Sequence, residues 1–163
     1  MKTIELNPNQ IITLNDYPVN SDSVLIEYYK KCKRGDKLPY VPVIRKDIVG
    51  KYLDKNLLEE FKRFELKNPA AEYFMLDGSH RTTALNLAGC KITAIIYETD
   101  SDIEETKKLI SAGKILQSGT LEHSIEAECE ILNKHFREKP YFMTVEQKTE
   151  KMKREKKIPQ TIK

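Results

Sequence analysis

Cysteine is scarce in this sequence, and the cysteines that occur form no pattern. Cys32, Cys90 and Cys129 are odd in number and widely spaced, and no CxxC is present. The three histidines have no metal-ligand spacing to one another or to the cysteines. The sequence therefore argues against a disulfide framework and against zinc. We expect reduced, mostly buried thiols, as is typical of a reducing compartment.

Long apolar runs are also lacking. No stretch approaches the roughly 20 apolar residues that a membrane span requires, and the amino-terminal MKTIELNPNQ has no apolar segment resembling a signal peptide. Charged residues make up 33% of the chain and the mean hydropathy is −0.57. We therefore expect a soluble, cytoplasmic protein with no membrane partner, and 163 residues suggest one domain with an appendage.

A basic surface is missing from most of the chain. The chain has 28 Lys and Arg and 25 Asp and Glu. Residues 148–163 contain seven of the basic and two of the acidic residues, a net charge of +5. The remaining 21 basic and 23 acidic residues give −2. The globular part is therefore not a basic nucleic-acid platform. Any weak nucleic-acid contact is expected in the basic tail, which we expect to be mobile and solvated.

What the chain does contain is one organising stretch, Tyr73–Thr99, with the sequence YFMLDGSHRTTALNLAGCKITAIIYET. A short apolar run is cut off by Asp-Gly-Ser, helix-forming residues follow, Gly89 closes them, and a β-branched run begins at Ile92. This pattern predicts a strand, a tight turn, a helix and a second strand.

The predicted turn carries the chemistry. Gly78 can adopt backbone angles closed to other residues, so the chain can swing from strand into helix and leave the first helical N–H groups free. Such a helix start binds anions, phosphate above all. Arg81 offers a planar fork of donors, Ser79 a hydroxyl, His80 a group that titrates near neutrality and Asp77 a carboxylate. Alternatively, Gly-Ser is ordinary turn chemistry and Asp77 caps the helix.

The motif Asp77-Gly78-Ser79-His80-Arg81, between a strand and an Ala/Leu-rich helix, resembles the ParB/sulfiredoxin superfamily. ParB proteins carry a G-E-R-R-type motif at this point, sulfiredoxins G-C-H-R and the free-serine kinases D-G-H-H-R. DGSHR is nearest to the kinase and sulfiredoxin forms. The resemblance extends over roughly the first two thirds of the chain and implies a small mixed sheet packed by helices, an α/β (α+β) fold.

In those families the turn and its arginine hold nucleotide phosphates, so the resemblance implies binding of ATP, ADP or CTP. The phosphate-binding candidates are Gly78, Ser79, His80, Arg81, Thr82 and Thr83. The catalytic candidates are Asp77, His80 and Asp16, with Asp77 also a candidate ligand of Mg²⁺. Asp16 is included because the kinase relatives draw a carboxylate from the loop after their first strand, although there the residue is Glu.

Two functions within the superfamily fit poorly. Sulfiredoxin chemistry needs a thiolate where this chain has Ser79, and a hydroxyl does not replace it without a strong activating base. ParB-type partition function lacks its arginine-bearing box, since the corresponding loop reads IITLNDYP. The carboxyl-terminal part is also too short for a helix-turn-helix domain with a dimerisation domain.

The rest of the chain predicts a nucleotide-binding domain over residues 1–117 and a helical extension with the basic tail over 118–163. A helical insertion at about 46–72 reads as a packed element rather than a lid. The predicted strands are Lys2–Leu6, Val41–Ile44, Tyr73–Leu76 and Ile92–Tyr97. The predicted helices are Val24–Lys33, Asp54–Leu66, His80–Ala88, one after Asp102, Leu121–Phe136 and one beginning near Thr144.

Two classes of function follow from these observations. One is an ATP- or ADP-dependent phosphotransferase or NTPase acting on a free amino acid or a similar metabolite. The other is a non-enzymatic, nucleotide-gated or DNA-associated ParB-like binding module. A third possibility is that the fold is kept and the nucleotide site is lost.

Overall fold

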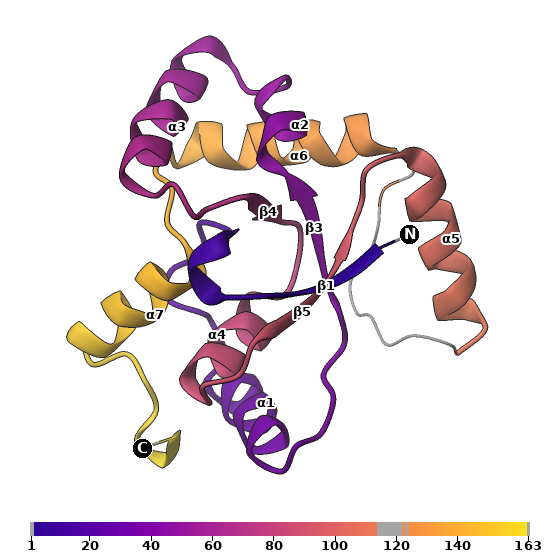
Figure 1. The fold of residues 1–163 in the computed structure, drawn as a ribbon. Coiled ribbons are helices and arrows are strands. Elements are labelled where there is room, and N and C mark those ends of the chain that lie inside the picture. Colours follow the sequence, from indigo (N-terminus) through magenta and orange to yellow (C-terminus); the bar gives the residue numbers. More distant parts are fainter. Residues whose placement is uncertain (1, 114–121, 123, 163) are drawn as a thin grey trace.

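The structure is a computed structural model and describes residues 2–113, 122 and 124–162. Within these residues lie five strands, β1 (Lys2–Leu6), β2 (Ile11–Ile12), β3 (Val41–Arg45), β4 (Tyr73–Met75) and β5 (Ile92–Ile96). The α-helices are α1 (Asp22–Lys33), α2 (Lys46–Gly50), α3 (Lys55–Lys67), α4 (Ser79–Leu87), α5 (Asp100–Ser111), α6 (Ile125–Glu138) and α7 (Val145–Arg154). Two short 3₁₀ helices, η1 (Pro8–Gln10) and η2 (Gln160–Ile162), complete the chain (Figure 1).

The strands form one mixed sheet in the order β1-β5-β3-β4-β2. β1 pairs antiparallel with β5, and β3 pairs parallel with β5 and antiparallel with β4. β2 adds a short parallel edge to β4. The predicted α+β fold with a small mixed sheet is confirmed. Pro42 lies in β3, the central strand, and pairs with Ile95 of β5. It is the second residue of its strand, and proline is tolerated near the start of a strand.

Local signals located most elements. Ser21 caps α1 by accepting a hydrogen bond from the N–H of Val24, and Thr144 caps α7 in the same way from Gln147. The sequence did not predict β2 or α2, because two and five residues are too few to show a period. α6 begins at Ile125 after its cap Ser124, later than predicted. The domain boundary predicted between residues 117 and 118 lies outside the described residues.

One face of the sheet packs against α2, α3 and α6. Its centre is a group of phenylalanines whose ring centroids lie 4.7–5.7 Å from their neighbours: Phe61 on α3, Phe74 on β4, Phe136 on α6 and Phe142. The predicted insertion is therefore a packed element. Asp54 at the start of α3 also accepts hydrogen bonds from Asn133 and Arg137 of α6.

The opposite face of the sheet lies toward α4, α1 and α7 (Figure 1). Val145 of α7 is buried among strand residues, Ile11 and Tyr73 among them. Two turns further along α7, Met152 is buried with Leu25 of α1 and Ala84 of α4. Helix α4 therefore packs against helices from both ends of the chain.

The expectation of a solvated tail is wrong for part of residues 148–162. Lys148, Thr149 and Met152 are buried in α7, and Ile162 is buried in η2. The reason is the spacing of Val145, Lys148, Thr149 and Met152, which places all four on one helical face. Helices α6 and α7 thus share the hydrophobic core of the preceding residues.

Two further expectations can be compared with the described residues. None of the helices described is both long enough and apolar enough to cross a membrane. Cys32 and Cys129 are buried free thiols, as predicted, and Cys90 is a half-buried one. Burial raises the pKa of the Cys129 thiol to about 12, so this side chain behaves as a small apolar residue.

Candidate functional site

The turn between β4 and α4 depends on Gly78. Its φ of 112° and ψ of 33° lie in the left-handed region, which glycine adopts without strain. A side chain here would also collide, because a Cβ would stand 3.1 Å from Nη2 of Arg81 and 3.3 Å from its Cζ. The predicted sharp swing from strand into helix is present, and the missing side chain lets the guanidinium lie against the turn.

The start of α4 has hydrogen-bond donors without acceptors. No side chain caps the helix, so the alternative that Asp77 is the cap is wrong; Gly78 occupies that position. Among the described residues, nothing accepts from the backbone N–H of Ser79, His80 or Arg81. The Ser79 hydroxyl is buried, with the residue 7% exposed, and its Oγ has no hydrogen-bond partner within the described part of the chain. A buried polar group without a hydrogen-bond partner is rare in a folded protein, and a bound ligand is one way in which it is satisfied.

Arg81 is at the predicted place but has partners within the chain. Its side chain is 2% exposed. Nη1 donates to the carbonyl oxygens of Pro39 at 3.1 Å and Tyr40 at 2.7 Å, and Nη2 donates to Oδ2 of Asp77 at 3.1 Å. The guanidinium therefore ties the segment before β3 to the turn. The donors Nη1 and Nη2 are thus used within the chain, unlike the backbone N–H groups of Ser79, His80 and Arg81 within the described residues.

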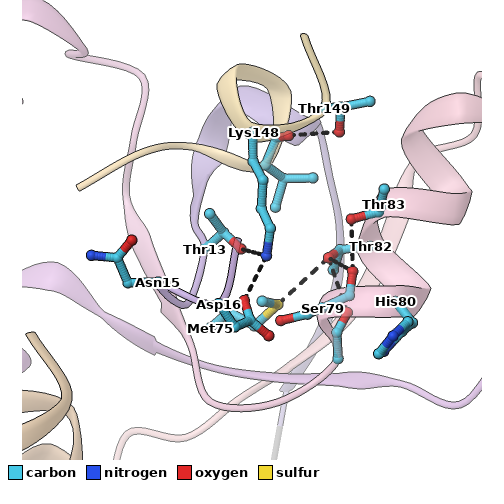
Figure 2. Close-up of polar contacts among 12 residues, drawn as sticks. Thr13, Asn15, Asp16, Met75, Ser79, His80, Thr82, Thr83, Lys148 and Thr149 are labelled. Carbon is cyan, nitrogen blue, oxygen red and sulfur yellow. Dashed lines mark hydrogen bonds and ion pairs between the residues drawn. The ribbon is translucent and has the colours of Figure 1, made fainter. Parts of the chain in front are cut away.

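The two threonines that follow turn their hydroxyls into the helix. Thr82 Oγ1 donates to the carbonyl of Gly78 at 2.9 Å, and Thr83 Oγ1 donates to that of Ser79 at 2.8 Å. Both residues are 1% exposed. Their hydroxyl hydrogens are thus already used within the first turn of α4 (Figure 2).

A loop between β2 and α1, residues 13–21, lies against the start of α4 and is held by two histidines. The N–H of Ser21 donates to Nε2 of His80 at 3.2 Å. The N–H of Asn15 donates to Nε2 of His135, on α6, at 2.8 Å. Both imidazoles accept, so both are neutral, and burial lowers the pKa of each.

The same loop carries Asp16, which the structure brings to the turn through a residue that the sequence analysis missed. Lys148 reaches from α7 and donates to Oδ1 of Asp16 at 2.6 Å and to Oγ1 of Thr13 at 3.5 Å (Figure 2). Lys148 is 1% exposed, whereas the Asp16 side chain is 47% exposed. The ammonium of Lys148 lies near enough to His80 to contribute to the lowered pKa of that imidazole. The available signal was its place between Val145 and Met152 on one helical face.

The turn itself is largely buried in this structure. Gly78 and Ser79 are buried, while Asp77 and His80 are half-buried. The two hollows of about 720 Å³ lie along α3, one against α7 and one near Arg137, away from the turn.

The metal expectation has only partial support in the geometry. Among the described residues, no three His, Cys, Asp or Glu side chains lie close enough together to hold a metal ion. Asp77 Oδ2 is bonded to Arg81, and its side chain is 46% exposed. One or two carboxylates suffice for Mg²⁺ when a nucleotide's phosphates and waters supply the other oxygens. Asp77 and Asp16 therefore fit a Mg²⁺ ion that arrives with a nucleotide, and not one held by the protein alone.

Protonation of the two loop-holding histidines should destabilise the fold. Because burial lowers both pKa values, the folded state binds fewer protons than the unfolded chain, whose histidines titrate near 6.5. This contribution to stability is complete above pH 6.5 and is lost as the pH falls below it. Urea unfolding at pH 7.5, 6.5 and 5.5 should show this decline. In the double variant His80→Gln, His135→Gln, whose amides do not titrate, the decline should be smaller; an equal decline would assign it to other groups.

Comparison with known proteins adds no family to this geometry. No protein-family model, no curated protein and no solved structure matches the chain. The likeness to the ParB/sulfiredoxin superfamily thus stays a prediction from DGSHR and its strand–turn–helix–strand setting. What the chain can do has to be argued from the start of α4.

Proposed function

We propose that the first turn of α4 binds a phosphate group of a nucleotide: ATP, ADP or CTP. The observation that carries the proposal is the buried Ser79 hydroxyl, which has no partner among the described residues, beside three backbone N–H groups that find no acceptor there either. Donors gathered at the positive end of a helix match the oxygens of a phosphate group. A ligand that pairs with them also removes the cost of leaving buried polar groups unsatisfied.

Two carboxylates at the same turn support phosphoryl transfer from ATP or ADP as the reaction. Asp16 and Asp77 each have a side chain about half exposed, which leaves oxygens accessible to a second substrate. In such a step the bond from the terminal phosphorus to its bridging oxygen breaks, and a bond to an acceptor hydroxyl oxygen forms. The hydroxyl proton passes to a carboxylate. An amino-acid-like alcohol such as free serine is the acceptor class, and water as acceptor makes the protein an NTPase.

Nucleotide binding should raise the thermal stability of the protein. A ligand that binds only the folded state, present at 100 times its Kd, adds about 2.7 kcal/mol to the free energy of unfolding. Thermal unfolding with ATP, ADP, CTP and pyrophosphate, each with and without Mg²⁺, should therefore show an upward shift for at least one of them. If none shifts the transition at millimolar concentration, the proposal fails.

Ser79→Ala is the matched variant for this measurement. Because the hydroxyl has no partner, its removal should leave the stability of the free protein unchanged or raise it by up to about 1 kcal/mol. The same variant should lose part of the ligand-induced shift. A shift equal to that of the wild type would separate Ser79 from the ligand.

Turnover decides between the two classes of function. An enzyme should release phosphate or phosphorylate an acceptor with Mg²⁺ present, and Asp77→Asn should reduce the rate strongly. Binding with neither activity would favour the non-enzymatic ParB-like module. The exposed cations after Lys148 are then the place to test for weak, salt-dependent nucleic-acid contact.

A further inference from the structure

The ion pair between Lys148 and Asp16 is unusual in its burial. The lysine is 1% exposed, and burial lowers the pKa of its ammonium, an effect that Asp16 opposes. An ammonium has three N–H donors. Here one bond is short, at 2.6 Å to Asp16, and a second reaches Thr13 only at 3.5 Å. A buried cation with a single close partner, itself half exposed, is incompletely compensated.

The position of this cation is fixed by packing on both sides. Val145 and Met152, one turn before and one turn after it, are buried in two different clusters of the core. The N–H of Thr13 donates to the carbonyl of Met143 at 2.9 Å, just before α7, so the loop is fastened to the same segment. The backbone of Lys148 is therefore held in place, and its ammonium lies against Asp16 in the interior rather than in solvent.

That place is beside the start of α4. Figure 2 shows the Lys148 side chain extending toward Asp16, with Ser79 and Thr82 at the start of α4 facing the same space. Asp16 and Lys148 both lie close enough to His80, the second residue of α4, to shift the pKa of its imidazole. The Ser79 hydroxyl, more than nine-tenths buried, has no hydrogen-bond partner among the described residues. A tetrahedral dianion would accept from the ammonium, this hydroxyl and the N–H groups of α4 together, whereas Asp16 accepts from the ammonium.

We infer that Lys148, from the carboxyl-terminal extension, is a phosphate-binding residue of the site. Asp16 forms the ion pair with its ammonium until a phosphate group displaces the carboxylate. The inference rests on the proposed function and extends it to α7. It makes the extension part of the binding site, and it makes release of Asp16 a consequence of ligand binding. A carboxylate freed in this way is available to accept a proton from an acceptor hydroxyl.

A structural ion pair and a phosphate-binding lysine predict opposite results for Asp16→Asn. If the pair only fastens the loop to α7, the variant should lose stability and bind phosphate ligands no better. If Asp16 competes with the phosphate group, the variant should bind pyrophosphate and ADP several-fold more tightly, although the free protein is less stable. Lys148→Met should weaken binding by about tenfold to a hundredfold, the range for a lost hydrogen bond to a charged group.

The experiment is isothermal titration of the full chain with pyrophosphate and with ADP, in parallel with urea unfolding of each variant. Lys153→Met is the matched control, because that lysine lies on the same helix with a side chain 52% exposed; its binding should stay within about twofold of the wild type. The double variant Asp16→Asn, Lys148→Met leaves no buried charge unpaired and keeps the test open if Lys148→Met alone does not fold. It should bind weakly, without the gain of Asp16→Asn.

The outcomes separate this inference from the proposed function. Binding by the wild type with unchanged affinity in Lys148→Met, or with no gain in Asp16→Asn, overturns the role of Lys148 and leaves phosphate binding at α4 standing. If the double variant retains the gain, Asp16 acts by general repulsion and the exchange on Lys148 is wrong. Absence of binding in every protein, the wild type included, overturns both.

Discussion

Replacing Arg81 by alanine should lower the free energy of unfolding by about 3 kcal/mol, the lower end for breaking a buried ion pair. The substitution removes three hydrogen bonds and leaves the carbonyl groups of Pro39 and Tyr40 without their donor. The Asp77 carboxylate loses its partner too, although it is half exposed and water replaces part of that bond. Urea unfolding followed by circular dichroism measures the change.

Arg34→Ala is the control for this prediction. Arg34 also donates twice, but to Asp36 alone and at the surface, where its side chain is 61% exposed. Exposed pairs of this kind contribute between nothing and about 1 kcal/mol. If the two alanine variants lose similar stability, the guanidinium of Arg81 does not hold the turn against the segment before β3.

Replacing Gly78 by alanine should have a comparably large effect, a loss of about 2–3 kcal/mol. The left-handed backbone at φ 112° costs a residue with a side chain on the order of 1–3 kcal/mol. The added methyl group would also press on the Arg81 guanidinium, with its nearest atom 3.1 Å away. Since that guanidinium is held by three bonds, the turn has to give way, and the first N–H groups of α4 lose their alignment. Thermal and urea unfolding measure the loss.

Gly50→Ala provides the comparison for Gly78→Ala. Gly50 ends α2, and a Cβ there meets only Cδ1 of Leu58 at 3.8 Å, an ordinary contact. Alanine in a helix is favoured over glycine by about 0.5–1 kcal/mol, so this variant should be neutral or slightly stabilised. Equal destabilisation of both variants would contradict the special role of the Gly78 backbone.

Local sequence chemistry was sufficient for the secondary structure that carries the site. An apolar run interrupted by Asp-Gly-Ser, followed by helix formers and closed by Gly89, predicts β4, the turn and α4, and the structure has them. The same reasoning predicted a helix beginning near Thr144, and α7 begins after that residue. These features depend on residues within about four positions of one another, so a linear reading captures them. The mixed α+β architecture is what the resemblance implied, and the five-stranded sheet of the described residues confirms it.

Tertiary structure alone decided the partners of the charged residues. Arg81 reads as an open phosphate fork in the sequence, yet its carbonyl acceptors lie 41 and 42 positions earlier in the chain. Lys148 reads as part of a solvated basic tail, yet it is buried and bonded to Asp16 across 132 positions. Hydrophobic burial of Val145 and Met152 brings α7 onto α4, and Lys148 is carried into the interior between them.

The sequence by itself thus determined where the sharp turn before α4 forms, because Gly78 alone among its residues tolerates the required backbone. Which cation lies beside that turn was decided only by packing. The stabilisation from the hydrophobic effect is proportional to the apolar area buried and does not depend on the separation of the residues in the sequence. It therefore brings the loop after β2 and a carboxyl-terminal helix to the start of α4. A charge pattern read along the chain does not contain that information.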